Sequence, residues 1–93
     1  MKRFENRVAV ITGGAAGIGL AAAIKFASEG ATVIVWDVKH PDENTLKQYE
    51  SRIHFYKVNT TNAEEIETSV KVILKQFGKI DILINNAGIT RDA

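Results

Sequence analysis

The sequence contains no cysteine, a single proline and no long apolar run. Without cysteine, neither a disulfide framework nor a thiolate metal site is possible. No apolar stretch approaches the roughly 18 residues that a membrane-spanning helix requires. The formal net charge is only +1, so the composition gives no reason to expect a nucleic acid or an anionic membrane as a partner.

The chain is also short, with 93 residues, of which 45% are hydrophobic and 25% charged. These values are ordinary for one small globular domain. Its first seven residues lack the apolar core of a secretory signal peptide, so we expect a cytoplasmic location and no membrane span. His40 and His54 stand alone, without a second ligand at metal-binding spacing, so we assign no metal site.

A glycine-rich stretch follows the first apolar run. Residues 8–11 are apolar, Thr12 ends the run, and Gly13, Gly17 and Gly19 follow before a stretch of strong helix formers. The order strand, glycine turn, helix directs a helix N-terminus at a phosphate group. The spacing fails the G-x-G-x-x-G fingerprint, and Leu20 replaces the lysine of a P-loop. Taken alone, the stretch fits a tight turn as well as a nucleotide loop.

Apolar, β-forming runs alternate with helical stretches along the whole chain. The expected strands are 8–11, 32–36, 53–58 and 81–84, and the expected helices are 20–27, a short one through Leu46 and Tyr49, and a long one ending at Phe77. Such alternation predicts an α/β fold with a parallel sheet and right-handed crossovers. We expect the strand order 3-2-1-4 and three layers, with the first two helices on one face of the sheet and the third on the other.

The third helix has start signals and one apolar face. Thr61 with Glu64 fits a capping box, and Asn62 with Glu65 resembles one. Residues at helical spacing form the face that we expect in the core: Ile66, Val70, Ile73, Leu74 and Phe77.

The fourth strand ends next to the glycine loop at the carboxyl edge of the predicted sheet, where open α/β sheets bind ligands. It is also an outer strand, with Ile82, Leu83 and Ile84 along it. An uncovered apolar edge and face favour association with another copy.

Polar residues end the second and fourth strands. Asp37 follows the second strand and can accept hydrogen bonds from the ribose hydroxyls of an adenosine, although a solvated loop aspartate is the alternative. Asn85 and Asn86 follow the fourth strand and either line a pocket or form a turn.

Two motifs together resemble those of the short-chain dehydrogenase/reductase family. Residues 12–19 match its T-G-x-x-x-G-I-G and residues 85–88 its N-N-A-G. The ending, residues 86–92, is especially similar to the 3-oxoacyl-[acyl-carrier-protein] reductases and acetoacetyl-CoA reductases of that family. The resemblance covers essentially the whole chain. It implies a Rossmann-like βαβαβαβ fold that binds a nicotinamide dinucleotide, with residues 1–93 as the N-terminal half of the domain, truncated after the fourth strand.

The resemblance also assigns roles to residues. It implies a pyrophosphate loop made of Gly13, Gly17, Ile18 and Gly19. Asp37 selects NAD over NADP, and Ala16 again favours NAD because NADP-dependent members often carry an arginine at that position.

The remaining cofactor contacts are implied in the same way. The nicotinamide side of the site is lined by Asn86, Ala87 and Gly88. Family members often contact the adenine with an aspartate where this chain has Asn59, whose amide makes part of that contact.

The family's proton-transferring groups are a serine and a Tyr-x-x-x-Lys pair, which lie beyond position 93 in relatives. Tyr49 is followed four residues later by Ile53, and Tyr56 by Thr60. Neither tyrosine has its lysine, so we assign no catalytic residue and expect an N-terminal part of a reductase that is inactive by itself.

Two functions therefore stay open. The first is the cofactor-binding portion of an oxidoreductase whose complete form reduces a 3-oxoacyl thioester, as in fatty acid biosynthesis, or a similar carbonyl by hydride transfer. The second is a non-catalytic half-domain that forms homo-oligomers through its apolar edge and binds little or no ligand. A monomer in solution would exclude the second.

Overall fold

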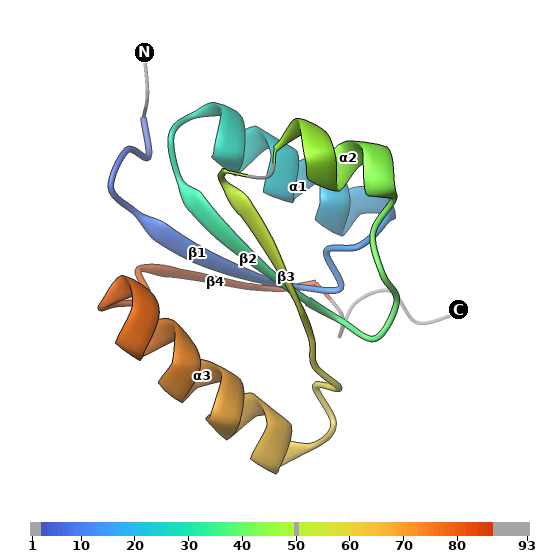
Figure 1. The fold of residues 1–93 in the computed structure, drawn as a ribbon, viewed down its shortest axis with the longest axis vertical. Helices are drawn as coiled ribbons and strands as arrows, with labels where there is room; N and C mark the ends of the chain where they lie inside the picture. Colours follow the sequence, from blue (N-terminus) through green and yellow to red (C-terminus); the bar gives the residue numbers. More distant parts are fainter. Residues whose placement is uncertain (1–2, 50, 87–93) are drawn as a thin grey trace.

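The computed structural model describes residues 3–49 and 51–86. Its elements are β1 (Val8–Thr12), α1 (Gly17–Ser28), β2 (Thr32–Asp37), α2 (Glu43–Gln48), β3 (Ile53–Lys57), α3 (Ala63–Phe77) and β4 (Ile82–Asn85). The four strands are parallel, in the order β3-β2-β1-β4. Helices α1 and α2 lie on one face of the sheet and α3 on the other (Figure 1). The predicted α/β fold, strand order and three layers are confirmed.

Strands β1 and β2 form the centre of the core because both of their faces are covered. Successive side chains of a strand point to opposite faces. Ile11 and Val35 pack with Ala23 of α1 on one face, whereas Val10 and Trp36 pack on the face that α3 covers. This two-sided burial explains why both strands read as nearly continuous apolar runs.

Helix α1 begins earlier than the sequence predicted, at Gly17 rather than at Leu20. The Leu20 N–H already donates to the Ala16 carbonyl at 3.2 Å, so the last two motif glycines belong to the first helical turn. The helix ends at Ser28 with Glu29 as its C-cap, and Gly30, the expected stop signal, follows with a φ of 98° in the left-handed region.

The N-cap of α3 is Asn62, and the predicted capping box from Thr61 is wrong. The Asn62 side-chain oxygen accepts from the N–H groups of Glu64 and Glu65, at 3.0 and 3.2 Å. The Glu65 carboxylate reaches back to the Asn59 N–H at 2.8 Å. An asparagine side chain in extended backbone at this position satisfies two N–H donors that the helix itself leaves unpaired.

The expected apolar face of α3 needs one correction, at Leu74, which is 46% exposed. Helix α3 touches the sheet along a narrow line that contains the buried residues Ser69 and Ile73. Each residue turns the helix by about 100°, so Leu74, one step after Ile73, points away from the sheet. Ile66, Val70 and Phe77 pack against the core as expected.

Strand β4 forms one edge of the sheet and carries an exposed apolar side chain. It pairs with β1, with Val10 opposite Leu83, and Leu83 is 62% exposed. Ile82 and Ile84, on the other face, are partly covered. Among the described residues, no helix has the length and apolarity that crossing a bilayer would require.

Candidate functional site

The carboxyl ends of β1, β2 and β4 bring the singled-out residues to one edge of the sheet. The loop after β1 is tied to β2 by a backbone hydrogen bond from the Gly13 N–H to the Trp36 carbonyl, at 2.8 Å. Asp37 ends β2 and Asn85 ends β4, which is the neighbour of β1 on its other side. This edge is where open α/β sheets hold their ligands.

Glycine is required at two bends of the loop. Gly13 has a φ of 68° and Gly17 a φ of 60°, a region that residues with a Cβ rarely adopt. A third glycine, Gly14, lies against β2, where an added Cβ would come within 3.0 Å of Val35 Cγ1. Glycine at these positions therefore lets the loop bend at Gly13 and Gly17 and pack closely against β2 at Gly14.

Gly19 and Asn86 meet at the base of this loop. A Cβ on Gly19 would overlap the Gly13 carbonyl and lie 2.7 Å from Asn86 Nδ2. Asn86 is only 5% exposed, and its amide donates to the Gly13 carbonyl at 3.1 Å. The Asn86 side chain thus fixes the loop to the end of β4.

The preceding asparagine has a different partner. The Thr12 hydroxyl donates to Asn85 Oδ1 at 3.0 Å, joining the ends of the adjacent strands β1 and β4. Asn85 is exposed, in contrast to its neighbour. Ala87 and Gly88, the other two predicted site residues of this segment, lie outside the described residues.

The Asp37 carboxylate is held by two backbone amides. Oδ2 accepts from the Ala15 N–H at 3.0 Å, and Oδ1 accepts from the Lys39 N–H at 3.1 Å. The Ala15 bond joins the end of β2 directly to the glycine loop. Sequence reasoning missed this contact, since nothing in the sequence indicates that the Ala15 amide points at a residue 22 positions later.

The N-terminus of α1 carries no side-chain cap. Its N-cap is Ala16, and no acidic residue lies in its first turn. By contrast, α2 and α3 are capped by the side chains of Asp42 and Asn62. The first N–H groups of a helix have no partner within the helix and carry partial positive charge, so this terminus can hold an anion. Ile18, in the same turn, is 76% exposed.

A hollow of about 140 Å³ opens beside Asp37. Its lining consists of Gly13, Trp36, Asp37, Val38, Val58, Asn59 and Thr60. The Asn59 side-chain oxygen accepts from both the N–H and the hydroxyl of Thr61, at 2.9 and 2.6 Å. The predicted residue Asn59 therefore lies at the hollow, and its oxygen is engaged within its own turn.

Four lining residues of this hollow were not singled out from the sequence. Val38 has a signal in the sequence, since it directly follows Asp37, and the structure leaves it 55% exposed. Trp36, Val58 and Thr60 have none, because their place at the hollow depends on the pairing of β2 with β3.

The two histidines contact aromatic rings. The ring centroids of His40 and Phe55 are 5.0 Å apart, and those of His54 and Phe77 are 5.3 Å apart. Burial lowers the pKa of His54 below its ordinary value of 6.5. Across residues 3–49 and 51–86, no group of three acidic, histidine or cysteine side chains is arranged to hold a metal.

Comparison with known proteins decides the family. The model of the short chain dehydrogenase family matches residues 7–93. The chain belongs to the short-chain dehydrogenase family. Proteins of this family bind a nicotinamide cofactor. The motif residues described above lie within the part of the chain that this model matches.

Individual relatives are similar over nearly all of this chain. The 3-oxoacyl-[acyl-carrier-protein] reductase FabG of Thermotoga maritima is 43% identical over 98% of the chain and 39% of its own length. A probable NADP-dependent mannitol dehydrogenase of Yarrowia lipolytica is 45% identical over 96% of the chain and 34% of its own length. The crystal structure of the Cj0485 dehydrogenase superposes with a TM-score of 0.84 at 38% identity, over 92% of this chain and 34% of that one. The chain thus spans well under half the length of these proteins.

Proposed function

We propose that residues 1–93 are the cofactor-binding portion of a short-chain oxidoreductase and that they bind NAD at the carboxyl edge of the sheet. The observation that carries the proposal is the position of Asp37. Its fixed carboxylate stands between an uncapped helix N-terminus and a hollow. An anionic pyrophosphate matches the helix N-terminus, a ribose with hydroxyl donors matches the carboxylate, and a flat base matches the hollow.

Each predicted residue has a part in this proposal. The pyrophosphate lies over the loop and first turn formed by Gly13, Gly17, Ile18 and Gly19. Asp37 accepts from the ribose hydroxyls, and Asn59 lies beside the adenine. The nicotinamide side is formed by Asn86, Ala87 and Gly88. The bound cofactor supplies or accepts a hydride, whereas the residues of this chain bind and orient it.

The proposal favours NAD over NADP. A 2′-phosphate would approach the Asp37 carboxylate, and two amides already stabilise the charge of that carboxylate. Ala16 offers no cation to a phosphate. The name of the Yarrowia lipolytica relative specifies NADP for that protein, so the preference of this chain rests on Asp37 and needs a direct comparison of the two cofactors.

The whole protein's reaction is a further part of the proposal. The 43% identity to a 3-oxoacyl-[acyl-carrier-protein] reductase supports reduction of a 3-oxoacyl thioester or a similar carbonyl by the complete enzyme. Within these 93 residues no tyrosine is followed by lysine at the family spacing. The Tyr56 hydroxyl instead donates to Gln76 Oε1 at 3.1 Å, on the α3 face. We therefore propose that the 93-residue chain binds cofactor without turnover.

Calorimetric titration of the chain with NAD, and separately with NADP, tests the proposal. Saturable binding that is tighter for NAD is expected. The same sample, purified free of host reductases, should not oxidise NADH with an acetoacetyl thioester. Absence of NAD binding by a folded sample would contradict the binding proposal, and measurable turnover would contradict the assignment of no catalytic residue.

A second candidate function is self-association without a ligand. Leu83 is 62% exposed on the α3 face of the outer strand β4, and Val72 and Leu74 of α3 are also exposed. Burying such side chains in a second copy is favourable. Light scattering on the titrated sample separates the candidates, because a monomer that binds NAD excludes this one.

A further inference from the structure

The outer strand on the opposite edge of the sheet, β3, presents backbone groups that β2 does not pair. The Val33 N–H donates to the Arg52 carbonyl at 2.7 Å, and the Val58 N–H donates to the Asp37 carbonyl at 3.2 Å. In a parallel ladder alternate residues face the neighbouring strand. The backbone N–H and C=O groups of His54 and Tyr56 therefore point toward β2, whereas those of Phe55 and Lys57 point outward.

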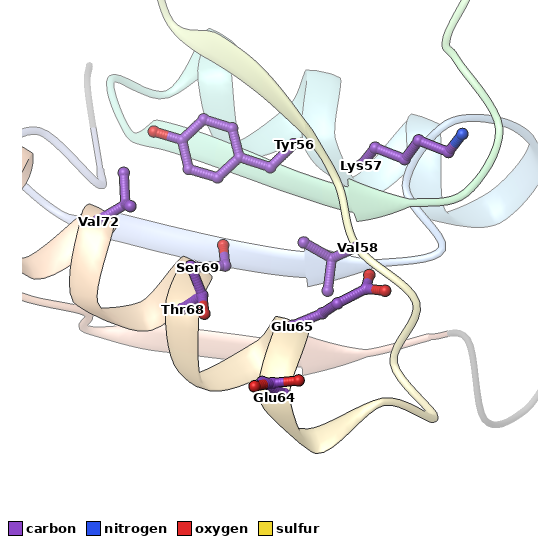
Figure 2. A pocket seen from close by; sticks show the side chains of 8 residues that line it. All are labelled: Tyr56, Lys57, Val58, Glu64, Glu65, Thr68, Ser69 and Val72. Carbon is purple, nitrogen blue, oxygen red and sulfur yellow. The ribbon is translucent and has the colours of Figure 1, made fainter.

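A cavity of about 490 Å³ lies next to this edge, between β3 and α3 (Figure 2). Tyr56 and Val58 of the β3 side face Ser69 and Val72 of α3 across it. The small side chain of Ser69, buried at 6% exposure, leaves the space that a larger residue at this core-facing position of α3 would fill. Cavities of this size hold organic groups in many proteins.

Two hydrogen bonds join the β3 side to α3 next to the cavity. The Tyr56 hydroxyl donates to Gln76 Oε1 at 3.1 Å, and the Asn59 N–H donates to Glu65 Oε1 at 2.8 Å. The first bond lies near the C-terminal end of α3 and the second near its start, at Glu65, which itself lines the cavity.

The rim of the cavity is acidic on the helix side. Glu64 and Glu65 line it at the start of α3, whereas Lys57 directs its ammonium group away from the helix (Figure 2). A basic group that follows an apolar group into the cavity would meet these carboxylates.

We propose that the outer edge of β3 and this cavity together dock an extended segment of a partner protein. The segment pairs its backbone with Phe55 and Lys57, places one apolar side chain in the cavity and sets a lysine or arginine beside Glu64. Strand addition of this kind combines main-chain hydrogen bonds with a pocket for an alternate side chain.

Pairing between the β3 edges of two copies of this chain fits the same surface poorly. On the face that holds the cavity, β3 carries His54 and Tyr56, and both are engaged within their own molecule. The His54 ring contacts Phe77, and the Tyr56 hydroxyl is bonded to Gln76. A copy's β3 therefore has no apolar side chain to place in the cavity. A small molecule in the cavity would leave the strand edge unpaired.

Titration of the ¹⁵N-labelled chain with a capped seven-residue peptide tests the proposal. The peptide has a central leucine, threonines on both sides of it and a lysine at each end. Saturable shifts of the Phe55, Lys57 and Val72 amide signals are expected, and a peptide with a central glycine should bind about tenfold more weakly. The proposal is independent of NAD, so the experiment is done without cofactor.

Matched variants locate the peptide. Val72→Trp fills the cavity and should weaken binding about tenfold, whereas Leu74→Trp should not weaken it, because Leu74 is equally exposed on α3 but does not line the cavity. Glu64→Gln should weaken binding more than Glu67→Gln, because Glu64 lines the cavity and Glu67 does not. A dispersed amide spectrum confirms that each variant is folded.

Several outcomes would overturn the proposal. They are no saturable shift with the leucine peptide, equal effects of the two tryptophan variants, or unchanged binding of a peptide whose backbone N–H groups are methylated. A dimer detected by sedimentation whose contact shifts fall on Phe55 and Lys57 would assign the edge to a second copy instead.

Discussion

The Asp37 carboxylate accepts a hydrogen bond from the backbone N–H of Ala15, at 3.0 Å. This bond makes the end of β2 and the glycine loop one unit, so the proposed ribose acceptor and the proposed phosphate loop are positioned together. The Lys39 N–H adds a second bond to the same carboxylate. A side chain already fixed in this way loses little conformational entropy when a ligand binds.

Replacing Asp37 by alanine is expected to weaken NAD binding by about tenfold or more, because hydrogen bonds to a charged group are lost. The affinity for NADP should fall less, since the repulsion of a 2′-phosphate is removed as well. Calorimetry with both cofactors measures the ratio. Asp42→Ala is the control, because Asp42 caps α2 by accepting from the Thr45 N–H. An unchanged preference for one cofactor in Asp37→Ala would count against the assigned role.

Alanine at Gly17 and alanine at Gly19 should lower the free energy of unfolding by different amounts. Gly17→Ala places a Cβ in open space, and its cost is the positive φ alone, roughly 1–2 kcal/mol. Gly19→Ala forces a Cβ into the Gly13 carbonyl and the Asn86 amide, so it should destabilise the chain more and displace the loop. Urea unfolding of both variants gives the comparison. Equal unfolding free energies would show that the loop and Asn86 are not packed as described.

Asp81 fastens the start of β4 to β1. Its Oδ2 accepts from the Val8 N–H at 2.8 Å, and this bond, with the nearby Lys79 and Arg7 cations, lowers the pKa of Asp81 below its ordinary 3.8. Protons therefore bind the unfolded chain first, and stability present above pH 3.8 is lost as the pH falls through the lower folded-state pKa. Asp81→Asn should unfold more easily at neutral pH and show a flatter acid profile. If Asp81→Asn kept the wild-type dependence of stability on acid pH, Asp81 would not have this role.

The lowered pKa of His54 predicts a second pH dependence of stability, closer to neutral pH. Burial against α3 lowers its pKa, so the folded state disfavours the protonated ring. The unfolded chain binds the proton first as the pH falls below about 6.5, and the contribution of His54 to stability then declines until the folded state is protonated too. Unfolding midpoints measured between pH 8 and pH 5 should fall more in the wild type than in His54→Gln. Parallel curves would show that His54 is not the responsible group.

The fold could be predicted from the sequence because each signal was local. The apolar runs of β1 and β2 and the turn at Gly30 depend on neighbouring residues. The alternation of elements then indicates a parallel sheet, for which 3-2-1-4 is a common strand order. Element ends were less certain. Both Thr61 and Asn62 offer a capping oxygen, and only the backbone conformation at Asn62 decides between them.

The candidate site was predictable in its residues but not in its contacts. Gly13, Gly17, Gly19, Asp37 and Asn86 gather at one edge because parallel strands end there together. The bonds from Ala15 to Asp37 and from Asn86 to Gly13 join positions 22 and 73 residues apart. No pattern within either segment indicates which amide meets which oxygen, so these contacts required the structure.

Mapping the NAD contacts on the ¹⁵N-labelled chain is the most direct test of the central proposal. Addition of NAD should shift the amide signals of Ala15, Gly17 and Gly19, together with those of Asp37 and Val38 beside the hollow. The Ala15 signal is the sharpest reporter, because its N–H is bonded to the proposed ribose acceptor. The signal of Lys71, on the solvent side of α3, should stay unchanged and serves as the internal control. Saturable shifts confined to the loop and the hollow would support the proposal, and a folded chain without shifts there at millimolar NAD would contradict it.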